Sequence, residues 1–445
     1  MFKITTIILL ASQFLIADNK NSNMGFKSHD TKQYSRMEPE TIVYSSNNSF
    51  SEPYQYNNRD FSSTLIDYSA NGWGLGKGTT NPITVNNDGD VFFTFRQYVG
   101  EYQTHGQIGA ASSYNGIYTL FNNINYNGSP PWSGGGVGGE GSAQGRYPSA
   151  LMTDEYPHAF WNEYTDLGDG YGGRPYYSFD GFGLNGGDFS YPTDIDPIWN
   201  EDKDLWMGSP DLSYAYGDVD EPIYNIVYAD WYIKNHVIFT SAATNHGHIV
   251  MNAGVEVFNH NDFMYSDPND NYTGYPIVSI NNSGHGAVVQ STKIRDLDSW
   301  SSMPHQNMVF KITNDYGRTW SHDTNIYIDG YSTGHYSIPV EIFNNIQDTY
   351  FSPEASYDEI LYVLNSLFVG YNYDFKIDSN GNLHFLLPIG GLVNPYDEEE
   401  LYMDFSWSGS GYYHISVHLD NLLLDDVSAW SFSKVANMEK SWSQI

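Results

Sequence analysis

Residues 82–95 read Pro-Ile-Thr-Val-Asn-Asn-Asp-Gly-Asp-Val-Phe-Phe-Thr-Phe, and this stretch decides the expected fold. Its two flanks, 82–85 and 90–95, are rich in β-branched and aromatic residues, which favour strands. The segment between them suits a tight turn, and an Asp-Gly step between two strand-like runs is a strong short-range signal for a β-hairpin. The stretch therefore predicts two antiparallel strands joined by a short turn.

The same order of strand, turn and strand recurs along the chain. Further hairpins are expected in four segments: 148–163, 222–240, 276–290 and 373–387. A further strand is expected after each hairpin and its variable loop, at Gly116–Phe121, Pro175–Phe179, His248–Phe258, Met308–Thr313 and Tyr412–Leu419. A repeat of three or four strands with long connections is typical of the blades of a β-propeller.

The expected fold class is therefore all-β, a β-propeller with six blades, five of which are visible as hairpins. The sixth blade is expected to use either Thr41–Tyr44 or Ile338–Phe343. One short helical insertion is expected at Ser352–Phe368, because this segment opens with Ser-Pro and then carries apolar residues at helical spacing.

The start of the chain indicates export. Lys3 precedes an apolar run from Ile4 to Ala17 that is too short to span a bilayer and ends in a small residue, as in a secretory signal peptide. We expect a signal peptide at 1–17, a polar linker at 18–40 and one propeller domain at 41–445. The expected location is secreted, periplasmic or on the cell surface of a bacterium. The chain has no cysteine, which excludes disulfides and thiolate chemistry.

The charge balance restricts the partners. Lys and Arg number 19 against 53 Asp and Glu, which gives a formal net charge of −34. A surface this acidic repels phosphate backbones and anionic lipids, so neither nucleic-acid binding nor membrane insertion is expected. Aromatic residues make up 16% of the chain, and they suit both strands and surfaces that face carbohydrate. The expected partner is an extracellular glycan or protein, and the chain is expected to be a monomer.

The most specific motif is Thr313-Asn-Asp-Tyr-Gly-Arg-Thr-Trp320. Asp315 can accept hydrogen bonds from the backbone of its own turn, and Gly317 can supply a positive φ. The motif resembles the Asp-box, or bacterial neuraminidase repeat, of sialidase-like β-propellers. The resemblance implies that the box is structural, that it joins the third and fourth strands of a blade, and that Trp320 is buried.

Sialidases of that superfamily share an Arg-Ile-Pro motif, two further arginines and a Tyr/Glu nucleophile pair. Arg146-Tyr-Pro148 resembles the first motif and would act as a cationic clamp for a carboxylate. Other arginines lie in no recognisable partner motif, and we expect each to pair with a nearby acid; they include Arg59, Arg96, Arg174 and Arg295. The sialidase arginine triad is therefore not found.

Hydrolysis of a neutral glycan needs only two carboxylates, roughly 5 to 9 Å apart. Glu163 is the first candidate, with Asp154 as its partner and Trp161 and Tyr164 as aromatic contacts for a sugar ring. Other carboxylates near expected strand ends are Glu155, Asp230, Glu256 and Glu341. With so many acids, any segment offers such a pair, so the signal is weak.

Two acidic turns suggest a cation site. Asp166 and Asp169 lie in one turn, and Asp267 and Asp270 lie in another. Such oxygen-rich turns suit Ca²⁺, the one cofactor that the sequence suggests, although Asx-turns explain the same residues without metal.

Two functions remain open. The first is a secreted recognition or scaffold propeller that binds extracellular glycans without clear catalytic machinery. The alternative is a glycoside hydrolase that uses a carboxylate pair on the propeller face. The missing arginine triad favours the first.

Overall fold

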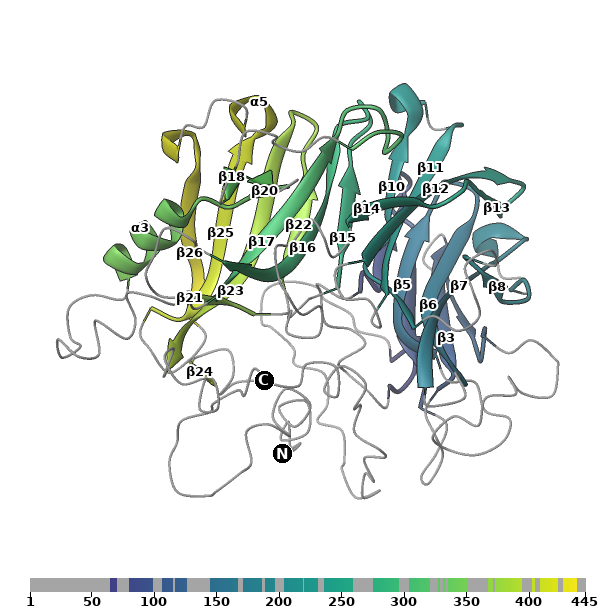
Figure 1. Ribbon diagram of the computed structural model, residues 1–445. Helices are drawn as coiled ribbons and strands as arrows, with labels where there is room; N and C mark the ends of the chain where they lie inside the picture. Colours follow the sequence, from purple (N-terminus) through teal and green to yellow (C-terminus); the bar gives the residue numbers. More distant parts are fainter. Residues whose placement is uncertain are drawn as a thin grey trace, which may run out of the picture.

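The computed structural model consists mainly of antiparallel β-strands (Figure 1). It describes residues 65–69, 80–98, 106–114, 117–125, 145–166, 171–185, 189–196, 204–218, 220–230, 236–258, 275–295, 304–320, 327–328, 331–332, 335–350, 367–370, 373–393, 402–404, 409–422 and 427–437. Within these ranges, none of the helices combines the length and the apolar character that crossing a membrane would require.

Five antiparallel sheets of four or more strands follow one another along the chain, and we call them blades 1 to 5. Blade 1 contains β1 (Ile83–Val85), β2 (Val91–Arg96), β3 (Ile108–Tyr114) and β4 (Ile117–Phe121). Blade 2 contains β5 (Gly145–Met152), β6 (Pro157–Asp166), β7 (Tyr171–Phe179) and β8 (Thr193–Asp194). Blade 3 contains β9 (Leu205–Met207), β10 (Asp211–Tyr214), β11 (Pro222–Asp230), β12 (His236–Asn245), β13 (His248–Met251) and β14 (Val255–Phe258).

The last two blades include most of the helical structure. Blade 4 contains β15 (Ile277–Ile280), β16 (Gly286–Arg295), β17 (Pro304–Thr313) and β20 (Tyr336–Ser337). Blade 5 contains β21 (Leu367–Val369), β22 (Asp374–Ile377), β23 (Asn382–Val393), β24 (Tyr402–Asp404), β25 (Gly411–His418) and β26 (Ser431–Asn437). The remaining elements are the ribbon β18 (Tyr327–Ile328) and β19 (Tyr331–Ser332), helices α3 (Val340–Tyr350) and α5 (Leu419–Leu422), and the 3₁₀ turns η4 (Gly183–Asn185), η5 (Ala215–Gly217) and η7 (Val427–Ala429).

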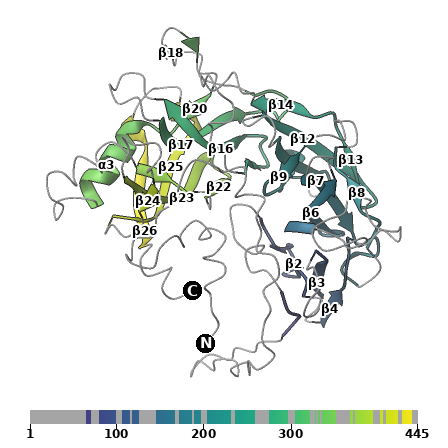
Figure 2. The same ribbon diagram turned by 60° about the horizontal axis from the view of Figure 1, so that its bottom comes forward.

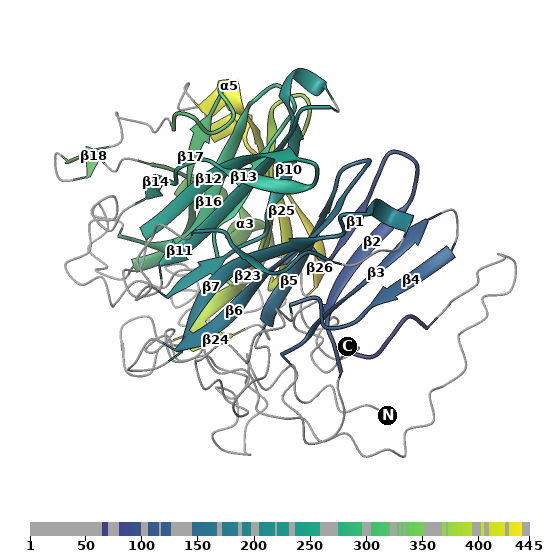
Figure 3. The same ribbon diagram turned by 90° about the vertical axis from the view of Figure 1, so that its right-hand side faces the viewer.

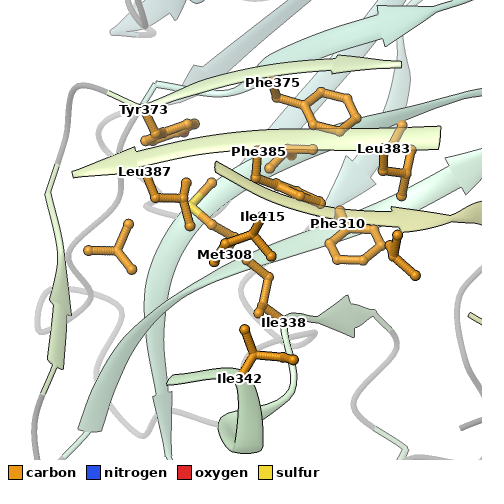
Figure 4. Close-up of a cluster of buried hydrophobic side chains, with 14 of the residues drawn as sticks. Met308, Phe310, Ile338, Ile342, Tyr373, Phe375, Leu383, Phe385, Leu387 and Ile415 are labelled. Atoms are coloured by element: carbon orange, nitrogen blue, oxygen red, sulfur yellow. The ribbon is translucent and has the colours of Figure 1, made fainter. Parts of the chain in front are cut away.

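The blades are arranged around a common axis, so each packs against the next through its broad face (Figure 2). Separate hydrophobic clusters join blades 1 and 2, 2 and 3, 3 and 4, and 4 and 5. The last of these packs Met308 and Phe310 of blade 4 on Phe375 and Phe385 of blade 5 (Figure 4). The chain is therefore an all-β propeller with little helix, as the sequence predicts.

We name the two ends of the propeller by their place in Figure 1. The upper end carries hairpin turns such as the one between β1 and β2 (Figure 3). In this turn the Asn86 side chain accepts hydrogen bonds from the backbone of Asp88 and Asp90. At the lower end β5 begins at Gly145 and β6 ends.

The number of blades differs from the expected six, because the described residues form five. Ile338–Phe343 does not form a strand. Its last four residues begin α3, and its first two directly precede that helix. Ile342 and Ile346 are one helical turn apart, and both pack into the cluster between blades 4 and 5. This tertiary packing stabilises a helix although the β-branched residues of the segment have low helix propensity. Thr41–Tyr44 lies outside the described residues.

The hairpin expected at 222–240 is confirmed as β11 and β12, the two long strands of blade 3. It does not open the blade, because the short strands β9 and β10 precede it and both pair with β11. The sequence predicts no strand at β3. Its residues, Ile-Gly-Ala-Ala-Ser-Ser-Tyr, have little strand propensity, but they form a strand in the structure. The helix expected at Ser352–Phe368 falls almost wholly outside the described residues, and its last two positions begin β21.

The Asp-box folds as a local turn after β17, the third strand of blade 4. The Asp315 carboxylate accepts hydrogen bonds from the backbone and hydroxyl of Thr319, at 2.9 and 2.6 Å, and Gly317 has a φ of 79°. Partial burial alone would raise the pKa of Asp315, but the hydrogen bonds from Thr319, Thr313 and Arg318 outweigh it and lower the pKa. All of these contacts lie within the segment 313–320, so the motif stabilises its own turn.

Trp320 connects the Asp-box to the preceding blade. Its ring is half-buried and meets the ring of Phe239 in blade 3 edge to face, with 5.1 Å between centroids. The box thus helps to fix the position of blade 4 against blade 3.

A buried histidine ties blades 2 and 3 at the upper end. His158 of β6 is fully buried, with Nε2 2.7 Å from the Gly247 carbonyl and Nδ1 3.0 Å from the Tyr224 hydroxyl. Burial lowers the pKa of His158 from 6.5 to about 4, so the ring is neutral at pH 7. The neutral ring can donate from Nε2 to the carbonyl and accept at Nδ1 from the hydroxyl.

We predict that Trp320→Ala destabilises the fold by about 2–3 kcal/mol, below the roughly 3–5 kcal/mol of fully buried aromatic residues, because the ring is half-buried. Thermal unfolding measures the change. A melting temperature equal to that of the unchanged chain would contradict the packing described here.

We predict that acid destabilises the chain through His158. Its pKa is depressed in the folded state, so its contribution is complete above pH 6.5 and declines as the pH falls toward about 4. The loss reaches on the order of 3 kcal/mol near pH 4. Urea unfolding at several pH values measures it: His158→Gln should flatten the dependence, and the exposed His285→Gln should leave it unchanged.

Candidate functional site

Glu163, the first catalytic candidate from the sequence, lies between blades 1 and 2. Its side chain is fully buried on β6 and accepts hydrogen bonds from Trp161 Nε1 at 2.9 Å and from Asn125 Nδ2 at 3.1 Å. The Asn125 amide also bonds the backbone at Gly106 and Ile108 of blade 1. These contacts make Glu163 part of the junction between two blades.

The proposed partners of Glu163 are not arranged as a sugar site. The ring of Trp161 is fully buried and stacks on Tyr176, so it offers no open face to a sugar. The side chain of Tyr164 lies outside the described residues. Asp154 lies in the turn before β6 at the upper end and accepts hydrogen bonds from Asn87. At about 3.3 Å per strand residue, roughly 20 Å or more separates Asp154 from Glu163, well beyond the separation that a hydrolase pair needs.

Arg146 lies near the start of β5, at the lower end. It is 5% exposed, and its Nη1 donates to the Gly145 carbonyl at 3.1 Å. The next residue, Tyr147, has a φ of 51°, which is uncommon for a side chain of this size. Its ring packs on Trp206 of blade 3 and Tyr275 before blade 4, with centroid distances of 5.9 and 5.6 Å. Blades 2 and 3 and the segment that precedes blade 4 therefore contribute to one buried aromatic cluster at this end.

The expected calcium ligands are not placed by the structure. Asp166 ends β6, but its side chain lies outside the described residues, as do Asp169, Asp267 and Asp270. Among the side chains that are described, no three of His, Asp and Glu are grouped to hold a metal ion.

Blade 3 brings together two carboxylates that the sequence singled out only as separate candidates. Asp230 ends β11 and is paired with His236, the first residue of β12, while Glu256 of β14 is paired with Ile238. Cross-strand partners and residues two apart share a face, so all three polar side chains lie on the same face of the blade. His236 Nε2 is 2.7 Å from Glu256 Oε2.

We call His236 and Glu256 the blade 3 dyad. The solvent exposure of the side chains increases from Asp230 through His236 to Glu256. Asp230 is 1% exposed, the His236 side chain 9% and the Glu256 side chain 45%. The Glu256 carboxylate accepts a hydrogen bond from Nε2–H and thereby favours the His236 tautomer in which Nδ1 is the basic nitrogen. A carboxylate that is open to solvent is thus coupled to a buried imidazole.

A cation of blade 2, Arg174, and a phenol of blade 3, Tyr228, meet the same short acidic segment of blade 2. Arg174 Nη2 donates to the Asp194 carboxylate at 2.8 Å and to the Asp196 carbonyl at 2.7 Å, which confirms that this arginine pairs with an acid. Tyr228, on the same face as Asp230, donates its hydroxyl to the Asp196 carboxylate. Burial, followed by this carboxylate, raises the pKa of Tyr228, so the phenol stays protonated.

Sequence reasoning missed His236 and Tyr228, and it expected Arg174 to pair with an acid without identifying Asp194. One signal was available: the predicted hairpin at 222–240 places the end of its first strand opposite the start of its second, and hence Asp230 opposite His236. Glu256 could not be added in this way, because β13 intervenes between β12 and β14.

Comparison with known proteins gives structural likeness only. No protein-family model and no curated protein matches the chain. Among solved structures, polysaccharide lyase Uly1 has a TM-score of 0.46 and 12% identity, covering 85% of this chain and 76% of its own. A PL25 ulvan lyase has a TM-score of 0.43 and 11% identity, covering 82% of this chain and 72% of its own. An α-L-arabinofuranosidase from Lactobacillus brevis has a TM-score of 0.36 and 12% identity, covering 82% of this chain and 94% of its own. At these values the likeness concerns the arrangement of strands and does not extend to the residues of the site.

We predict that Glu163→Ala lowers the free energy of unfolding by about 2–4 kcal/mol, because two buried donors lose their acceptor. Chemical denaturation measures the loss. Asp154→Ala is the control, an exposed carboxylate whose removal should change stability by no more than about 0.5 kcal/mol. Equal effects of the two substitutions would contradict the buried role of Glu163.

Proposed function

We propose that this propeller is an extracellular carbohydrate-active enzyme that cleaves glycosidic bonds by acid–base chemistry. The observation that carries the proposal is the His236–Glu256 contact beside buried Asp230. Glycosidic bond cleavage needs one group that donates a proton and one that accepts it. The blade 3 dyad and Asp230 offer both on one face.

The two carboxylates flank one imidazole. Asp230 lies on β11 opposite His236, and Glu256 lies on β14 opposite Ile238, two residues further along β12. Two strand spacings of about 4.8 Å and this offset separate their Cα atoms by roughly 12 Å, and the 2.7 Å contact with His236 Nε2 shows that the Glu256 side chain reaches back toward Asp230. The two also differ in environment, one buried and one exposed, as an acid and a base require.

In this proposal Glu256 meets the substrate and His236 holds or supplies the proton. Tyr228, kept protonated by its burial, is a hydrogen-bond donor to Asp196 rather than a base. Export of the chain, which the first seventeen residues favour, would place the enzyme where glycans are found.

Glycan recognition without cleavage is the second candidate. The 16% aromatic content of the chain motivates it, whereas the cluster of Tyr147, Trp206 and Tyr275 is buried and offers no open ring face to a sugar. This candidate requires no proton transfer, so it predicts binding that is independent of His236 and Glu256.

Glu256→Gln should lower the rate of glycan cleavage about 10²- to 10⁴-fold, the usual contribution of a positioned acid or base. The measurement is release of new reducing ends from a panel of neutral and uronate-containing polysaccharides. His236→Asn should give a similar loss, and Asp154→Asn, an exposed carboxylate at the other end, should give none.

Binding measured in parallel separates the two candidates. Retention of glycan in affinity electrophoresis by Glu256→Gln, with loss of cleavage, supports the enzyme. Binding by the unchanged chain without any cleavage across the panel supports recognition and contradicts the enzyme.

A further inference from the structure

Blade 1 has two apolar faces, but the described residues cover only one. Phe92, Ile108 and Ala110 pack on blade 2. On the opposite face, the strand register aligns Ile83, Phe93 and Leu120 in one row, and Val85, Val91 and Tyr118 in the next. We call Ile83, Val85, Phe93, Tyr118 and Leu120 the outer face of blade 1.

This outer face is open to solvent. Ile83 is 52% exposed, Val85 57%, Tyr118 55% and Leu120 39%. In Figure 3 the four strands of blade 1 lie side by side at the end of the row of blades. A contiguous apolar sheet face of this kind marks a surface that another element covers.

Blade 5, the other end of the row, is a poor match for it. The face of blade 5 that does not pack on blade 4 carries polar side chains, among them Lys376, His384, His414 and Ser416. Pressing these against an apolar sheet would remove their water without new hydrogen bonds, which is costly. In the part of the chain that the structure describes, no hydrophobic cluster joins blades 1 and 5.

The described residues 65–69 lie at the edge of blade 1, so the preceding part of the chain is attached there. Ser69 forms a β-bridge with Gln97 at the end of β2, and the Tyr98 N–H donates to the Tyr68 carbonyl at 2.9 Å. The 64 residues that precede Leu65 are thus attached at the edge of blade 1. Tethering at this point gives them a high effective concentration at the outer face.

The composition of these residues suits the face. Segment 41–61 contains Ile42, Val43 and Tyr44 in its strand-like start, followed by Phe50, Tyr54, Tyr56 and Phe61. Segment 41–61 carries only three charged residues, the acids Glu52 and Asp60 and the base Arg59. A segment with aromatic residues and so few charges can pack on an apolar sheet face without burying many charges.

We propose that residues 41–61 pack on the outer face of blade 1, with the strand-like start at 41–44 as the anchor. This contact covers the apolar rows of β1, β2 and β4 and supplies, from the chain itself, the cover that blade 5 does not provide. It does not depend on the proposed enzymatic activity.

Thiol labelling of the full chain tests the proposal, because the chain has no cysteine and each introduced thiol is unique. Leu120→Cys reports on the outer face, and Tyr216→Cys, at a position 88% exposed on blade 3, is the matched control. We expect a maleimide to modify Leu120→Cys about tenfold more slowly than Tyr216→Cys. Adding Ile42→Asp and Tyr44→Asp should bring the two rates together without changing the control.

Three outcomes would overturn the proposal. Equal rates for Leu120→Cys and Tyr216→Cys mean that nothing covers the face. Slow labelling that survives Ile42→Asp and Tyr44→Asp means that another element covers it. Slow labelling that disappears on dilution means that a second copy of the chain does so.

Discussion

Burial of both faces of each central blade is the constraint on which this structure depends. In β6, Ala159 and Trp161 pack on blade 1 while the residue between them, Phe160, packs on blade 3. In β17, Phe310 packs on blade 5 and Val309 on blade 3. A strand with no solvent face needs apolar residues at successive positions, which is why these runs do not alternate. The blades at the two ends of the row each leave one face to be covered differently.

Polar side chains set how neighbouring blades align. The Asn162 amide of β6 pairs with both the N–H and the carbonyl of Met207 in β9, at 2.7 and 3.1 Å. The Asp204 carboxylate accepts from the Gly173 N–H and from Trp206 Nε1. Buried polar groups destabilise a fold unless they are paired, so such groups tolerate few other alignments. Glu163 belongs to this set, because its buried carboxylate accepts hydrogen bonds from Trp161 and Asn125 between two blades.

The site in blade 3 has a different origin. Asp230, His236 and Glu256 lie on three strands, and only the pairing of those strands places them on one face. Their exposure differs because of their strands. Asp230 lies on β11, whose face toward blade 2 is buried, whereas Glu256 lies on β14, which is nearer to solvent. The same arrangement brings Tyr228 to the Asp194–Asp196 segment, so that blade 2 and blade 3 share one polar region.

Local signals in the sequence determined the hairpins, the all-β class and the Asp-box turn. Asn86, Asp315 and Gly317 act within a few residues of themselves, and their hydrogen bonds need no distant partner. The tertiary structure decided the number of blades, the helix at α3 and the meaning of each acidic residue. Ile342 becomes helical because a core between two blades receives one side of it, and Glu163 differs from Glu256 only in what surrounds it. A carboxylate carries the same chemistry everywhere in a sequence, whereas burial and hydrogen-bond partners, which long-range packing alone supplies, decide whether it holds the fold together or meets a substrate.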